Sequence, residues 1–312
     1  MAALKSSYDL IIVGGGPAGY TAAIYGIRAN MSTLLIAGEK AGGQLMLTTD
    51  VEDYPGFPKG VQGPELMKLF RDQALNLGVD IINEDVTKAD AKGKIKYAWA
   101  DNKKYSAKVI IIATGASAKW LGLKNEQRLI GKGVTSCAVC DGAFFKNKPV
   151  AVVGGGDTAM REAIFMANLA SSVTIIHRRD ELKAQEVLQD RVKANKKIKF
   201  LWNTEVQDVL GNEKVTGIKL INNKTKKTSE LKIDGLFIAI GHKPNTGFLK
   251  GQVKLDDHNY IALKEPGVST KTSVPGVFAA GDVHDYRYMQ AVTAASAGCK
   301  AALDAHEYLE QS

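Results

Sequence analysis

The chain contains the same strand, glycine turn and helix pattern twice, and this repeat limits its fold more than any other feature. The first copy, YDLIIVGGGPAGYTAAIYGIRA, begins at Tyr8; its apolar run ends at Val13 and is followed by Gly14, Gly16 and Gly19 in G-x-G-x-x-G spacing. The first glycine of such a motif permits a tight turn, the second lets the backbone approach a pyrophosphate, and the third lets the helix pack on the strand. We therefore expect a dinucleotide-binding unit, with the phosphates at the helix N-terminus.

The second copy, KPVAVVGGGDTAMREAIFMANLA, begins at Lys148 and carries Gly154, Gly156 and Ala159 in G-x-G-x-x-A spacing. Each copy is followed by a similar closing apolar strand, VIIIATGA in the first and LFIAIGHKPN in the second. A single glycine motif of this kind occurs in many α/β proteins that bind no nucleotide, whereas two copies with matched closing strands favour two dinucleotide sites. The predicted fold class is α/β, with two Rossmann-like dinucleotide-binding domains.

The segment SVPGVFAAGDVHDY, near the end of the chain, predicts a nested domain order. It reads as a strand over residues 276–280 followed by Gly281 and Asp282, a carboxylate well placed for a ligand hydroxyl. Because this segment lies far beyond the second nucleotide unit, we expect it to return to the first domain. Residues 1–117 and 247–312 would then form the first domain, and residues 118–246 an inserted second domain.

A cationic cluster follows the second strand of the second unit. That strand ends at Ile176, and His177, Arg178, Arg179 and, a little further on, Lys183 come next. An NAD site has a carboxylate near this position for the ribose hydroxyls, whereas guanidinium groups match a phosphate. The second unit is therefore expected to prefer NADPH, although a solvated run of surface charges is the alternative interpretation.

The stretch SCAVCDGAFF contains a close cysteine pair, Cys137 and Cys140, with Asp141 directly behind it. Zinc sites use four ligands, but the third cysteine, Cys299, lies in a small-residue helical stretch and the five histidines are scattered, so a metal site is disfavoured. A redox-active pair is the favoured interpretation. We expect Asp141 to donate and accept protons there, with a turn or helix-cap aspartate as the alternative, and Cys299 to be a buried core thiol.

Charge and hydropathy exclude several classes of protein. The net charge of +8 comes from lysines scattered in short groups, and no aromatic-rich basic stretch indicates nucleic-acid binding. No apolar run approaches the roughly 18 residues of a spanning helix, and the start lacks the features of a secretory signal. We expect a cytoplasmic protein that binds neither nucleic acid nor membrane.

The motifs GGGPAG, AGGQL, ATGA, CAVCDG, GGGDTA, HRRD, IGHKPN and VFAAGD occur in the order typical of one family. Over essentially its whole length the chain resembles the low-molecular-weight thioredoxin reductases of bacteria and archaea. The resemblance implies a homodimer with FAD in the outer domain and NADPH in the inserted one. It implies that hydride passes from NADPH to FAD, that electrons then reduce the cysteine pair, and that the pair exchanges with the disulfide of a separate thioredoxin.

The resemblance also assigns residues. The implied FAD contacts are Gly14, Gly16, Pro17, Ala18, Gly19, Gly43, Gln44, Asp282, Gln290 and Ala291. The implied NADPH contacts are Gly156, Asp157, Thr158, Ala159, His177, Arg178, Arg179 and Lys183. The implied catalytic residues are Cys137, Cys140 and Asp141, with Cys140 facing the flavin.

The chain departs from the family pattern at three positions. Arg161 stands where many relatives have Glu, Met289 where many have Arg, and Lys183 in place of an expected Arg. Two alternative enzymes stay open: a flavoprotein like the ferredoxin or flavodoxin–NADP reductases, which needs no CxxC pair, and a reductase of another thioredoxin-like partner. A flavin-bound scaffold would be the interpretation if Arg161 and Met289 had disabled hydride transfer.

Overall fold

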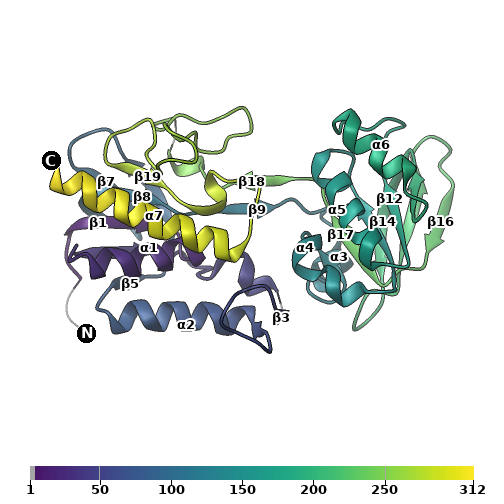
Figure 1. Ribbon diagram of the computed structural model, residues 1–312, viewed down its shortest axis with the longest axis horizontal. Coiled ribbons are helices and arrows are strands. Elements are labelled where there is room, and N and C mark those ends of the chain that lie inside the picture. Colours follow the sequence, from purple (N-terminus) through teal and green to yellow (C-terminus); the bar gives the residue numbers. More distant parts are fainter. Residues whose placement is uncertain (1–3, 49, 250) are drawn as a thin grey trace. The chain divides into compact units, whose positions relative to one another are not determined.

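The computed structural model describes residues 4–48, 50–249 and 251–312 (Figure 1). The chain divides into two compact units: a first unit that ends at Ser117 and resumes over Lys243–Ser312, and a second unit, Ala118–His242. The two crossings are short strands, β9 (Ala116–Ala118) and β18 (His242–Pro244), which pair with each other. The second unit is therefore inserted in the first.

The first unit is built on a seven-stranded mixed sheet. Five strands are parallel, in the order β5-β2-β1-β8-β19: β5 (Asp80–Ile82), β2 (Thr33–Ile36), β1 (Ser7–Val13), β8 (Lys103–Ile112) and β19 (Val277–Ala279). The hairpin β6 (Val86–Asp90) and β7 (Lys96–Ala100) joins the other part of the long strand β8 in antiparallel fashion. The central strands carry almost uninterrupted β-branched and leucine side chains, as expected for strands buried on both faces.

The helices of the first unit are α1 (Pro17–Arg28), α2 (Gly63–Asn76) and α7 (Ala291–Glu310). Its short 3₁₀ helices are η1 (Gly43–Leu47), η3 (Gly247–Leu249) and η4 (Gly281–Val283), and β3 (Asp50–Val51) pairs with β4 (Val61–Gln62). Helices α1 and α7 lie side by side (Figure 1), close enough that a Cβ added to Gly298 would lie 2.1 Å from the carbonyl oxygen of Ala18. Their alanine-rich faces pack with α2 over one side of the sheet.

The second unit has a five-stranded, fully parallel sheet in the order β10-β17-β11-β12-β13. Its strands are β10 (Val134–Thr135), β17 (Gly235–Ile238), β11 (Pro149–Val153), β12 (Ser172–Ile176) and β13 (Ile198–Leu201). Helices α5 (Asp157–Leu169) and α6 (Glu186–Ala194) contribute to the core on one face. The antiparallel sheet β14 (Thr204–Leu210), β15 (Gly217–Asn222) and β16 (Thr228–Leu231) contributes to the core on the other.

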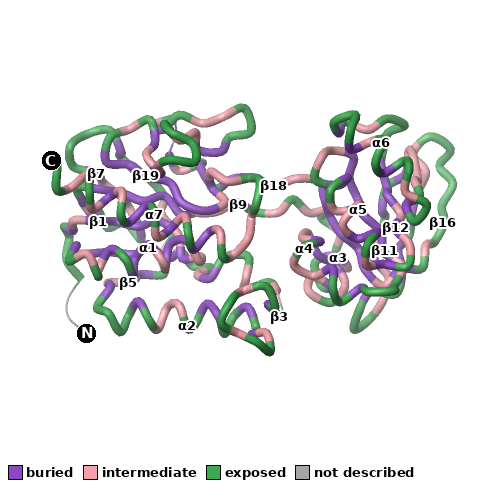
Figure 2. The backbone as a smooth tube through the Cα atoms, in the orientation of Figure 1, coloured by how far each residue is buried: buried purple, intermediate pink, exposed green. Residues whose placement is uncertain are grey.

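Three short elements complete the second unit: α3 (Lys124–Arg128), α4 (Ala138–Asp141) and the 3₁₀ turn η2 (Gly142–Phe145). Within each unit the strands of the main sheet are mostly buried, and the helices and loops around it alternate between buried and exposed residues (Figure 2). No helix in the part of the chain that the structure describes is long and apolar enough to cross a membrane.

The two units repeat one register at the carboxyl ends of their strands. In the first, Val13 pairs with Ile36 on one side and Ile112 on the other; in the second, Val153 pairs with Ile176 and Ile238. The predicted closing strands are therefore confirmed, and the α/β class with two Rossmann-type units holds. Each glycine turn begins where three strand ends meet, the edge at which open parallel sheets bind ligands.

Candidate active site

The first glycine turn has the geometry of a phosphate cradle. Gly14 has a φ of 112°, and a Cβ there would lie 2.3 Å from the carbonyl oxygen of Ala113. A Cβ on Gly19 would lie 1.7 Å from the carbonyl oxygen of Gly14, so this position must be glycine for α1 to pack on the turn. At Gly16 a Cβ would meet nothing within 4 Å, and no side chain caps this end of α1, which begins at Pro17. The open space and the free N–H groups fit a pyrophosphate.

Other predicted residues of the first unit gather near this turn. The Gly42 N–H donates to the carbonyl oxygen of Gly15 at 2.8 Å, which brings Gly43 and the exposed Gln44 towards it. A Cβ added to Gly281 would lie 3.0 Å from the Cβ of the buried Ala18, so Asp282 sits beside the start of α1.

Asp282 supplies the carboxyl group among the residues predicted to bind FAD, and its pKa is strongly shifted. Burial, helped by the neighbouring Asp285, raises the pKa of Asp282 to about 7. A largely desolvated carboxyl group with no cationic partner among the described residues is suited to bind a ligand hydroxyl. Gln290 is the N-cap of α7 and Ala291 its first residue, and the hydroxyl of Thr293 accepts the Gln290 N–H at 3.3 Å.

The second glycine turn repeats this geometry. Gly154 has a φ of 153°, and a Cβ there would lie 2.7 Å from the Cβ of the fully buried Ala159. Gly156 is the N-cap of α5, has no side-chain cap, and a Cβ there would meet nothing within 4 Å. Asp157 lies in the first turn of α5 and accepts the Gln185 N–H at 2.8 Å, and the next residue, Thr158, is exposed.

The predicted cationic cluster folds back over this second turn. The backbone N–H of Lys183 donates to the carbonyl oxygen of Gly155 at 2.8 Å, and a Cβ on Gly155 would lie 2.2 Å from the His177 ring. Arg178 and Arg179 are exposed. Burial, and then the charges of Arg179, Arg178 and Lys183, lower the pKa of His177, while a backbone hydrogen bond with Glu181 opposes them. The Nε2 atom of His177 is buried and has no hydrogen-bond partner in the described part of the chain.

Cys137 and Cys140 form a disulfide, with their Cα atoms 5.4 Å apart. Cys137 is the N-cap of α4, and its sulfur accepts the Cys140 N–H at 3.2 Å, while the Cys137 N–H donates to the Thr135 hydroxyl at 3.1 Å. Both cysteines and Asp141, the last residue of α4, are partly buried. The pair is therefore held in a short helical turn in which both cysteine residues are partly exposed.

Helix α4 packs against α5, the helix that starts at the second glycine turn (Figure 1). A Cβ on Gly142 would lie 2.9 Å from the sulfur of Met166, so the backbone after the pair lies directly on α5. One side chain of α5, Glu162, reaches the turn that holds the pair: its carboxyl group accepts a hydrogen bond from the backbone N–H of Ala138, which lies between the two cysteines in the sequence.

Sequence reasoning missed Glu162. The signal was present, because Glu162 follows the buried Ala159 by three residues and precedes the buried Met166 by four, which places a carboxyl group on the inner face of the helix. Burial raises the pKa of Glu162 to about 8, against the opposing hydrogen bond from Ala138. Its Oε2 atom is buried and has no hydrogen-bond partner among the described residues.

The expectation for Cys299 was wrong. This thiol is only partly buried, and it shares a hydrogen bond with the hydroxyl of Tyr25 that raises the pKa of Tyr25. The reason is the position of Cys299 on α7, at the margin of the contact with α1 rather than at the alanine-rich centre of that contact.

Among the described residues, no group of three or more His, Cys, Asp or Glu side chains could hold a metal ion.

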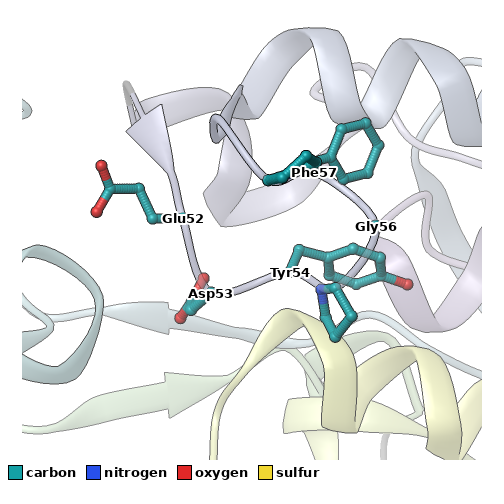
Figure 3. Close-up of a pocket in the computed structure, with 7 residues that line it drawn as sticks. Glu52, Asp53, Tyr54, Gly56 and Phe57 are labelled. Atoms are coloured by element: carbon teal, nitrogen blue, oxygen red, sulfur yellow. The ribbon is translucent and has the colours of Figure 1, made fainter.

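The first unit also has a hollow of about 460 Å³, lined by the single loop Glu52–Pro58. Figure 3 shows the rings of Tyr54 and Phe57 on one side of this loop and the Glu52 carboxylate on the other. The Tyr54 ring packs edge-on against Phe70, at 5.6 Å between centroids. None of the predicted site residues lines this hollow.

Known proteins similar to this chain support a redox role for the cysteine pair, which lies between the two glycine motifs in the sequence. The family model described as pyridine nucleotide-disulphide oxidoreductase matches residues 8–298. A thioredoxin reductase of Mycolicibacterium smegmatis is 47% identical over 100% of this chain and 99% of its own, and one of Streptomyces clavuligerus is 51% identical over 96% and 94%. The chain belongs to the thioredoxin reductases of the pyridine nucleotide-disulphide oxidoreductase family.

A solved structure of a thioredoxin reductase from Giardia duodenalis agrees with this assignment. It is 40% identical, covers 98% of this chain and 100% of its own, and has a TM-score of 0.94. The structure from Streptococcus pyogenes, at 39% identity, has a TM-score of 0.93. The chain is therefore that of an oxidoreductase. The Cys137–Cys140 disulfide fits the redox-active disulfide of this family.

Proposed function

We propose that the chain transfers electrons from NADPH, through FAD and the Cys137–Cys140 pair, to the disulfide of thioredoxin. The observation that carries this proposal is the disulfide between two partly exposed cysteine residues at α4, the helix that packs against the one beginning at the second glycine turn. Family membership supplies the reaction class, and the position of the pair supplies the group that reacts.

The first unit is the proposed FAD domain. The open space at Gly16, the uncapped start of α1 and the buried Asp282 carboxyl together fit a pyrophosphate and a polyol hydroxyl. Pro17, Ala18, Gly19, Gly43, Gln44, Gln290 and Ala291 are the further contacts that we propose.

The inserted unit is the proposed NADPH domain. Gly156 and the residues Asp157, Thr158 and Ala159 would hold the pyrophosphate at the start of α5. His177, Arg178, Arg179 and Lys183 would hold the 2′-phosphate, because a phosphate dianion compensates the cationic charge that the cluster gathers. The neutral state favoured for His177 would become charged as the dianion binds.

When bound, the two cofactors supply a hydride and convert it into the electron pair that reduces a disulfide. The protein supplies the rest. The cleaved Cys137–Cys140 bond gives one thiol and one thiolate, and the thiolate attacks the partner's disulfide to form a mixed disulfide. The second cysteine then displaces the partner's thiol and restores the intramolecular bond. Asp141 would hold the proton that the leaving sulfur takes up.

We propose a cytoplasmic homodimer whose partner is a separate thioredoxin. A reductase of ferredoxin or flavodoxin type is not favoured, because it makes no use of the disulfide that this chain forms. The test is steady-state oxidation of NADPH with thioredoxin as acceptor, in the wild type and in Cys137→Ser and Cys140→Ser. Turnover in the wild type and its loss in both variants are expected; an acceptor reaction that survives in either variant would overturn the proposal.

A further inference from the structure

We propose that Glu162 is a positioning residue of the cysteine pair, and that the proton on its carboxyl group sets how readily the pair is reduced as pH changes. This inference rests on the proposed redox role of Cys137 and Cys140. It concerns a residue that no step of the proposed electron path uses.

Glu162 contacts the turn that holds the cysteine pair. Its carboxyl group accepts the N–H of Ala138, the residue directly after Cys137. It therefore lies one peptide unit from the backbone of Cys137, close enough for a charge that develops on the pair to act on the carboxyl group. The N–H at this point belongs to the same turn in which the Cys140 N–H donates to the Cys137 sulfur.

One oxygen of the Glu162 carboxyl group is left without a partner among the described residues. Oε1 or Oε2 can each accept hydrogen bonds, but the structure pairs the carboxyl group with one backbone N–H, and Oε2 is buried with no partner among the described residues. A buried carboxylate that lacks a cation is costly, so the group is held in its protonated form near neutral pH. The pKa of about 8 agrees with this direction.

On the elements packed against α5, the ionisable groups that are not on exposed residues are Asp141 and the cysteine pair. Strands β11 and β12 and the turn η2 carry no ionisable side chain, and the charged residues of α6 (Glu186, Asp190, Arg191 and Lys193) are all exposed. On α5 itself Asp157 hydrogen-bonds the Gln185 N–H, and Arg161 is exposed. On α4 the ionisable groups are Asp141 and, once the disulfide is reduced, the two thiols.

The direction of the effect follows from like-charge repulsion. Reduction of the disulfide takes up two electrons and one proton and leaves one thiol and one thiolate. A thiolate next to Glu162 disfavours its carboxylate, so the carboxyl group keeps its proton to higher pH in the reduced protein than in the oxidised one. Between these two pKa values reduction takes up one further proton, on Glu162, in addition to the one on the thiol. Reduction therefore becomes harder with rising pH more steeply than it does without a titrating group at this position.

The experiment equilibrates the FAD-loaded protein with oxidised and reduced dithiothreitol at a series of pH values and counts free thiols by alkylation. The wild type is compared with Glu162→Gln, which keeps the acceptor for the Ala138 N–H but cannot titrate. The matched control is Glu186→Gln, the same change at an exposed position of the same unit. Because dithiothreitol is the reductant, the result does not depend on NADPH or thioredoxin.

We expect the three proteins to coincide at about pH 6, where Glu162 is protonated in both redox states. At about pH 9.5 the disulfide of Glu162→Gln is expected to be about tenfold easier to reduce than that of the wild type and of Glu186→Gln, a factor that corresponds to one pKa unit of coupling. Equal reduction equilibria for wild type and Glu162→Gln across the series would overturn the inference while leaving the redox pair intact. A pair that dithiothreitol cannot reduce would overturn both proposals.

A second readout covers a Glu162→Gln protein that fails to fold. In the wild type, the infrared difference spectrum between reduced and oxidised protein at about pH 8.5 should contain a protonated carboxyl band gained on reduction. The band should shift in Glu162→Asp, whose carboxyl group is one methylene shorter. A difference spectrum with no carboxyl band would contradict the inference.

Discussion

Thr114 and Asn245 hold each other by two reciprocal hydrogen bonds. The Thr114 hydroxyl donates to the carbonyl oxygen of Asn245 at 2.8 Å, and the Asn245 side-chain amide donates to the carbonyl oxygen of Thr114 at 2.9 Å. The Ser117 hydroxyl adds a bond to the Asn245 side-chain oxygen at 3.1 Å. The chain thus leaves and re-enters the first unit at one hydrogen-bonded point, where the ATGA and KPN motifs meet.

Asn245→Ala is expected to loosen this point. It removes two side-chain hydrogen bonds at an exposed position, each worth about 1 kcal/mol or less, so the melting temperature should fall by roughly 2–4 °C. Calorimetry measures this, and limited proteolysis should show faster cleavage near the two crossings. Asn76→Ala, at an exposed asparagine in the last turn of α2 and outside this network, is the control. An unchanged melting temperature and cleavage rate would mean that the network contributes nothing to the anchoring.

Gly156→Val tests whether the open space before α5 is used by a ligand. A Cβ at Gly156 meets nothing within 4 Å, so the fold and the FAD content should stay as in the wild type. The side chain would occupy the space proposed for the pyrophosphate, and KM for NADPH should rise by about 10²-fold. Steady-state kinetics checks this. A KM that stays at the wild-type value would remove Gly156 from the NADPH site.

Arg179→Gln tests the proposed recognition of the 2′-phosphate. A charge-assisted hydrogen bond contributes about 1.5–3 kcal/mol, so the preference for NADPH over NADH, as the ratio of kcat/KM values, should fall by roughly ten- to a hundredfold. Arg191→Gln, at an exposed arginine on α6, should leave the ratio unchanged. Equal ratios in wild type and Arg179→Gln would favour the interpretation of this arginine as a solvated surface charge.

Glu162→Gln should also change how stability depends on pH. The pKa of Glu162 is raised from 4.5 to about 8 by burial, so the folded protein binds more protons than the unfolded chain between these values. Its contribution to stability is therefore complete below about pH 4.5 and is lost as pH rises through about 8. The glutamine variant lacks this loss. We compare the unfolding free energy of the variant with that of the wild type, measured by urea unfolding at each pH. This difference should shift in favour of the variant by about 2–4 kcal/mol between about pH 5 and about pH 9. Parallel pH profiles would contradict the buried position of this carboxyl group.

The elements that the sequence predicted well are those encoded locally. The glycine turns, the strands that precede them and the cluster after Ile176 follow from short-range backbone requirements and from hydrophobic runs. The hydrophobic runs of neighbouring strands end at paired residues, because parallel strands have their carboxyl ends at the same edge of the sheet. The close spacing of Cys137 and Cys140 is equally local, and the structure joins the two residues in a disulfide.

The features that the sequence did not predict depend on packing between distant segments. The Glu162 contact exists because α4 lies on α5, and the Thr114–Asn245 exchange joins residues 131 positions apart. Cys299 was misplaced because a small-residue helix does not reveal which of its faces meets a neighbour. The loop Glu52–Pro58 lines a hollow, and its Tyr54 packs on Phe70 of α2, a contact that no motif encodes.

The most direct test of the account is an anaerobic titration of the FAD-loaded protein with NADPH, read in the flavin absorption band, followed by oxidised thioredoxin. The account predicts that NADPH bleaches the flavin and that thioredoxin restores its absorption. In Cys137→Ser and Cys140→Ser, NADPH should still bleach the flavin, but thioredoxin should not restore it. Restoration by thioredoxin in both serine variants, at the wild-type rate, would contradict the claim that the electrons pass through the cysteine pair.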